Sequence, residues 1–155
     1  MPALLTRARH LGTGLTALLA LADPAQRRLW GEMRAYVRRL PALLSSPLPA
    51  VLAAQTPAAA DLTLPEPTLR RLADAAALFE RRSPLGLCLR RSLVRYHYLR
   101  RAGVPLTLNF GARFKAGQAD RDITGHAWVT LNGAAYHEDG ENYQDFVTML
   151  KYPAA

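Results

Sequence analysis

The chain has 155 residues, half of them apolar, which is typical of one globular domain and excludes a disordered chain. Its single cysteine excludes an internal disulfide framework and a cysteine-rich zinc site, and it fits a reducing compartment. The formal charge of +8 comes almost wholly from arginine. Because these arginines are spread over several predicted helices, we attribute the charge to composition and expect no nucleic-acid partner.

The N-terminal part predicts helices. Apolar residues recur at helical spacing over residues 14–22 and again over 24–44, where Trp30, Met33 and Val37 share one side. The first stretch has nine residues, too few for a bilayer crossing, which takes about 20. We therefore expect a cytoplasmic protein. Attachment of the second, aromatic- and arginine-rich helix to a membrane surface is the alternative.

Residues 45–67 are rich in proline and alanine and predict a connection without regular structure. This stretch is the candidate boundary of the chain. We place an N-terminal helical segment with its linker at residues 1–60 and the core of the protein at residues 61–155.

Two further helices and a sheet are predicted in the core. The first helix spans about residues 66–82, and Ser83 and Pro84 then cap and open a second helix that ends at Gly103. Beyond Gly103 the apolar period changes to two. This period predicts strands over residues 104–114, 123–131 and 134–139, the last two joined by the two-residue hairpin signal Asn132-Gly133. Helices followed by an antiparallel sheet define an α+β fold.

The candidate nucleophile is Cys88, near the start of the predicted helix after Ser83. Partial positive charge at a helix N-terminus favours a thiolate, the reactive form of cysteine. His126 follows on a predicted strand, in Gly-His-Ala-Trp-Val, and is the candidate base. The alternative is that Cys88 only packs in the core, because free cysteines are often buried and inert.

The hairpin suggests an acid to orient His126. With a two-residue turn, paired residue numbers sum to 265, so Asp139 lies opposite His126 on the same sheet face. Glu138, one residue earlier, faces the other side in this register, and a bulge would exchange the two. Either Asp139 or Glu138 is therefore the candidate third member of a triad.

The residues Leu87-Cys-Leu-Arg-Arg-Ser-Leu93, Asn109-Phe-Gly-Ala-Arg113 and His126-Ala-Trp-Val129, with Asn132-Gly133, resemble the leader peptidases of lasso-peptide biosynthesis. These are stand-alone, transglutaminase-like cysteine peptidases. The likeness covers about residues 83–145. It implies a papain-like core in which a cysteine-bearing helix packs on a small antiparallel sheet that carries the histidine and the acid. The family's acid falls about twelve residues after the histidine, which here is Glu138, with Asp139 adjacent.

The resemblance implies a peptidase that removes the leader from a ribosomally made precursor peptide, with no cofactor and no metal. It also implies partners: the precursor, a small leader-binding protein and an ATP-dependent, asparagine-synthetase-like enzyme that then forms the macrolactam. Two alternatives stay open. One is another acyl transferase or amidase on the same core, and the other is a non-catalytic basic binding module.

Overall fold

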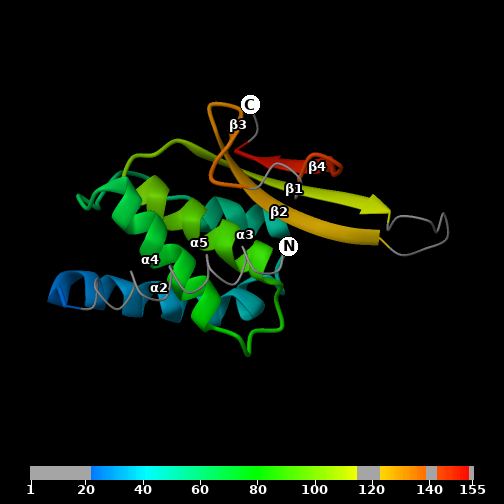
Figure 1. The fold of residues 1–155 in the computed structure, drawn as a ribbon. Helices are drawn as coiled ribbons and strands as arrows, with labels where there is room; N and C mark the ends of the chain where they lie inside the picture. The colour runs from blue at the N-terminus through cyan, green and yellow to red at the C-terminus, as the bar shows by residue number, and fades with distance from the viewer. Residues whose placement is uncertain (1–21, 115–122, 139–142, 154–155) are drawn as a thin grey trace, which may run out of the picture.

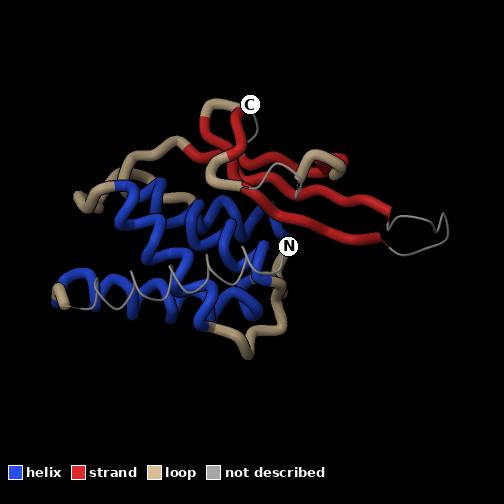
Figure 2. The backbone as a smooth tube through the Cα atoms, in the orientation of Figure 1, coloured by secondary structure: helices blue, strands red, loops and turns tan. Residues whose placement is uncertain are grey.

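The computed structural model describes residues 22–114, 123–138 and 143–153. Its helices form one layer and its strands another, lying over the helices and extending beyond them at one end (Figure 2). This is the expected α+β arrangement. The helix predicted over residues 14–22 lies outside the described residues.

Helix α2 (Pro24–Leu43) begins where the Asp23 side chain accepts a hydrogen bond from the backbone N–H of Ala25. Its apolar side packs against α4 (Glu66–Phe79) and α5 (Leu87–Arg101). The buried residues of α2 are Leu29, Met33, Tyr36, Val37 and Leu40. They belong to the same apolar cluster as Leu72 of α4 and Val94 of α5. The predicted boundary near residue 60 stays a prediction.

The prediction that the proline- and alanine-rich residues 45–67 lack regular structure is wrong, because they contain helix α3 (Leu48–Gln55). Val51 and Leu52 of α3 are buried. Pro47 immediately precedes the helix, where a missing N–H costs nothing, so the prolines of this stretch start a helix and do not prevent one. The hydroxyls of Thr56 and Tyr96 are hydrogen-bonded at 2.8 Å and hold the end of α3 against α5.

The described strands form a four-stranded antiparallel sheet in the order β3-β2-β1-β4. They are β1 (Leu106–Phe114), β2 (Ile123–Leu131), β3 (Ala134–Ala135) and β4 (Val147–Tyr152). The hairpin prediction is confirmed. Asn132 and Gly133 both have positive φ, 51° and 82°, as a type I′ turn requires, and Leu131 pairs with Ala134.

One strand prediction was wrong, and one strand was missed. The strand predicted over residues 134–139 ends at Ala135, and His137, with φ 50°, turns the chain out of the extended conformation. Strand β4 was not predicted. It adds to the other side of β1, through a register shift beside Phe110 and Gly111, and forms an edge of the described sheet.

Candidate active site

Cys88 is the second residue of α5 and is half-buried. Gly86, and not the predicted Ser83, caps this helix, and it does so without a side-chain hydrogen bond. A Cβ atom at Gly86 would lie 3.8 Å from the Cys88 sulfur, so the glycine leaves this side of the thiol uncovered. The thiol therefore lies at the positive end of the helix, as the sequence predicts.

Buried Arg90 fixes the start of α5. Its Nε donates to the carbonyl of Ala77, near the end of α4, at 3.2 Å. One of its terminal nitrogens donates to the carbonyl of Leu85, in the turn before α5, at 2.5 Å. One guanidinium thus ties the two helices to the turn between them, which holds Cys88 in a defined place.

Two hydrogen bonds show how α5 runs along the sheet. Arg100 donates to the carbonyl of Leu106 at 2.9 Å, and the buried hydroxyl of Ser92 donates to the carbonyl of Ala127 at 2.8 Å. Ala127 pairs with Phe110. Arg100 follows Ser92 by eight positions, a rise of about 12 Å along the helix. Phe110 follows Leu106 by four positions, about 13 Å along the strand. Helix α5 therefore runs antiparallel to β1, alongside β2 (Figure 1).

The same rises locate Cys88. It precedes Ser92 by four residues, one turn or about 6 Å along α5, which corresponds to about two strand residues. The paired residues two positions beyond Phe110 and Ala127 are Ala112 and Gly125. Along the strand direction, Cys88 is therefore level with Gly125, the residue that precedes His126. Alternation along β2 turns the His126 ring to the face of Trp128, opposite the face of Val129, which the helices bury.

His126 lies on β2, opposite Gly111, and its ring stacks on Trp128 at 5.8 Å and contacts Phe146 at 5.2 Å between centroids. Its Nε2 is buried and has no hydrogen-bond partner among the described residues. Burial, and then the positive charges of Arg91 and Arg113, lower the pKa of His126 below its ordinary value of 6.5. The imidazole is therefore neutral near pH 7, in the form that can accept a proton.

Of the two candidate acids, Glu138 is described and Asp139 is not. The Glu138 side chain is fully buried, and its carboxylate accepts from Arg91 at 2.8 Å and from Arg95 at 3.2 Å. The positive charge of Arg91 also lowers the pKa of His126. Glu138 and His126 thus share Arg91 as a neighbour. Asp139 lies outside the described residues, and its predicted pairing with His126 stays a prediction.

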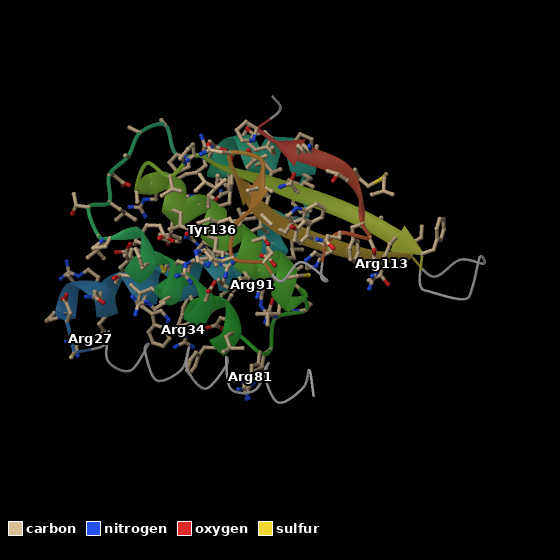
Figure 3. All side chains as sticks on the ribbon, turned by 45° about the horizontal axis from the view of Figure 1, so that its top comes forward. Arg27, Arg34, Arg81, Arg91, Arg113 and Tyr136 are labelled. Carbon is tan, nitrogen blue, oxygen red and sulfur yellow. The ribbon has the colours of Figure 1, made fainter. Side chains whose placement is uncertain are left out.

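Arg95 holds the segment that carries Glu138. It donates twice to Asp74 of α4, at 2.6 and 2.8 Å, and its other terminal nitrogen faces the carbonyls of Tyr136 and His137 at 3.4 Å. The Tyr136 hydroxyl donates to a Glu66 carboxylate oxygen. Figure 3 labels Arg91 and Tyr136 near the middle of the molecule, over the helices in this view. The chain after β3 is therefore held to α4 and α5 by buried charges.

Three residues that position this site were not predicted from the sequence: Arg90, Ser92 and Arg95. Ser92 follows Cys88 by four residues and Arg95 follows it by seven, so Cys88, Ser92 and Arg95 lie on one side of α5. The signal that could have identified Ser92 and Arg95 was this spacing, because it places polar residues on the side of the helix that is buried.

His97 has a different place from the candidate site. Its Nδ1 is 2.7 Å from the carbonyl of Gln55, and its ring stacks on Tyr36 at 4.8 Å. Burial lowers the pKa of His97 below 6.5. His97 therefore joins α5 to α3 and α2, nine residues from Cys88 on the same helix.

Comparison with known protein families identifies the superfamily to which the chain belongs. The model of the transglutaminase-like superfamily matches residues 32–151, which is more than half of the chain. The chain belongs to the transglutaminase-like superfamily, whose members include cysteine peptidases and acyltransferases. No curated protein and no solved structure gives a significant match. Across the described residues, none of the helices has the length and apolar character that would let it cross a bilayer.

Proposed function

We propose that the chain is a cysteine peptidase in which Cys88 is the nucleophile and His126 is the general base and acid. The carrying observation is the Ser92–Ala127 hydrogen bond, which sets the start of α5 against the strand position next to His126. The half-buried thiol and the neutral imidazole supply the two functions that thiol catalysis needs.

The proposed reaction has two stages. Neutral His126 takes the proton of the Cys88 thiol, and the resulting thiolate attacks the peptide carbonyl carbon. The C–N bond then breaks, and the imidazolium of His126 gives that proton to the departing amine. The acyl group is then a thioester on Cys88. Water, deprotonated by neutral His126, attacks the thioester, the C–S bond breaks, and the free acid leaves with the thiolate restored.

The orienting acid would hold the His126 ring in one tautomer. Buried, unpartnered Nε2 is the ring atom that needs an acceptor. Glu138 is supported by its burial near Arg91 and by the twelve-residue spacing from His126, and Asp139 by the hairpin register up to Tyr136. Activities of Glu138→Gln and Asp139→Asn decide between them, because the orienter's variant loses activity by orders of magnitude.

The proposed substrate is a ribosomally made precursor peptide, cut between leader and core. The motif set around Cys88, Asn109 and His126 that resembles lasso-peptide leader peptidases supports this choice. In that setting a small leader-binding protein delivers the precursor, and a separate ATP-dependent macrolactam synthetase acts on the new N-terminus.

The test is cleavage of the precursor from the same gene neighbourhood, followed by mass spectrometry. Cys88→Ala and His126→Ala should abolish cleavage. The control His137→Asn should retain it, since asparagine tolerates the positive φ of that exposed position. Undiminished cleavage by Cys88→Ala would refute the proposal.

The same measurement separates the proposal from its alternatives. An acyl transferase would join the acyl group to an added amine, and the product would carry the amine's mass. A non-catalytic binding module would show no cleavage, and its only cysteine would react slowly with iodoacetamide below pH 7.

A further inference from the structure

Exposed apolar side chains gather at one end of the sheet. Among the described residues, the large apolar side chains that are exposed are Phe79, on α4, and four others on β1, β2 and β4. Those four are Phe114, Ile123, Val147 and Met149, with 63–72% of each residue exposed. Clustered apolar exposure of this kind marks interaction sites on soluble proteins.

These residues line one open pocket of about 720 Å³, which we call the distal groove. Phe114 pairs with Ile123, and Ala112 pairs with Val147, so each pair points to one face of the sheet. Alternation along β1 puts Phe114 on the same face as Leu106 and Leu108, which the helices bury. The distal groove is therefore the uncovered continuation of the face on which the helices pack.

The start of α5 lies where the covered part of this face ends. Cys88 is level with Gly125 and Ala112, and Phe114 and Ile123 are two strand residues further on, about 7 Å away. Gly125 is exposed, and a Cβ atom there would meet only the carbonyl oxygen of Gly111, at 3.9 Å. The strand position at Gly125, between the level of the thiol and the groove, therefore carries no side chain.

The rim of the groove also connects to the candidate base. Arg113 and Asp145, which both line it, form an ion pair at 3.3 Å. The Arg113 guanidinium lies 4.6 Å from the centre of the Phe146 ring, and Phe146 contacts His126. Figure 3 shows Arg113 near the far end of the β1–β2 hairpin.

The geometry points to the distal groove as a substrate subsite that binds a large apolar side chain of the peptide, two or three residues from the scissile bond. This inference rests on the proposed peptidase function. An extended peptide advances about 3.3–3.5 Å per residue, so a carbonyl at Cys88 places such a side chain about 7–10 Å away. Along the strand direction, that distance reaches the level of Phe114 and Ile123, past Gly125. The volume of the groove falls within the range of ligand pockets, about 300–1,000 Å³.

The test uses peptides derived from the precursor, with leucine, glutamate or lysine placed in turn at each of the three positions on either side of the cut. The wild-type enzyme should prefer leucine over glutamate at least tenfold in kcat/KM at one position, two or three residues from the cut. Ile123→Lys should shift that preference toward glutamate at the same position and leave the other positions unchanged. The matched control is Phe79→Lys, an exposed apolar residue on α4, which should keep the wild-type preference.

The outcomes separate this inference from the proposed function. Alkylation of Cys88 by iodoacetamide at the wild-type rate shows that Ile123→Lys keeps an intact site. Unchanged preference in that variant, with Cys88→Ala still inactive, overturns the subsite and leaves the peptidase standing. A dimer that Ile123→Lys dissociates, with no change in preference, would instead assign the groove to a second copy of the chain.

Discussion

Replacing Ser92 by alanine tests the contact that sets Cys88 against the strand of His126. The Ser92 hydroxyl is fully buried and donates to the Ala127 carbonyl at 2.8 Å. That carbonyl lies on the edge of β2 that pairs with β3. The last backbone hydrogen bond that the structure describes along this edge runs from the N–H of Tyr136 to the carbonyl of Val129, just after β3 ends. No strand among the described residues continues there, so the variant leaves the carbonyl buried and unpaired.

An unsatisfied buried acceptor costs about 1–3 kcal/mol, a factor of about 5–150 in the folding equilibrium. We expect Ser92→Ala to lose that much unfolding free energy in urea titrations. Since the same bond holds the start of α5 to β2, kcat for peptide cleavage should fall with little change in KM. The control Ser45→Ala removes an exposed hydroxyl bond to Ala42 and should change the unfolding free energy by less than about 0.5 kcal/mol. Equal stability of the two variants would refute the reasoning.

Three further predictions concern stability in the same urea titrations. Arg95→Met should lose about 3–5 kcal/mol, because it removes the arginine that pairs with Asp74 and one of the two arginines that pair with the fully buried Glu138 carboxylate. By contrast, Arg101→Met, which breaks a surface ion pair, should lose at most about 1 kcal/mol. Gly111→Ala should lose about 1–3 kcal/mol of unfolding free energy, because its Cβ would lie 2.9 Å from the indole ring of Trp128. Gly31→Ala, whose Cβ would have nothing within 4 Å, should gain stability. The reverse order of the two variants would contradict this packing. Because burial lowers the pKa of His97, the unfolded chain binds a proton at this residue before the folded chain does. The free energy of unfolding should therefore fall as the pH drops below about 6.5, until the folded-state pKa is reached. His97→Gln should flatten this fall, and an unchanged slope would contradict the burial of His97 as its cause.

The sequence was most informative where local chemistry decides structure. Asn132-Gly133 alone predicted the hairpin and its register, because few other residue pairs tolerate two successive positive φ angles. The period of apolar residues likewise predicted α2, α4, α5, β1 and β2 to within a few residues.

Local signals failed where distant contacts decide. Helix α3 lies in a proline-rich stretch and forms because Val51 and Leu52 fill space in the core. Strand β4 is mostly exposed, and its apolar alternation is interrupted between Met149 and Leu150, where the register shifts, so its pairing with β1 is what identifies it. The end of β3 depends on Arg95, which draws the carbonyls after Tyr136 toward α5.

The candidate site divides in the same way. The residue types for thiol chemistry can be read from local sequence: one cysteine at the start of a helix, and one histidine on a strand beside a hairpin. How the segments that carry them pack is visible only in the tertiary structure, because the bonds from Ser92 to Ala127 and from Arg95 to Glu138 join residues 35 and 43 positions apart. Such contacts leave no local pattern, since each is fixed by the burial of its partner and not by its neighbours in the chain.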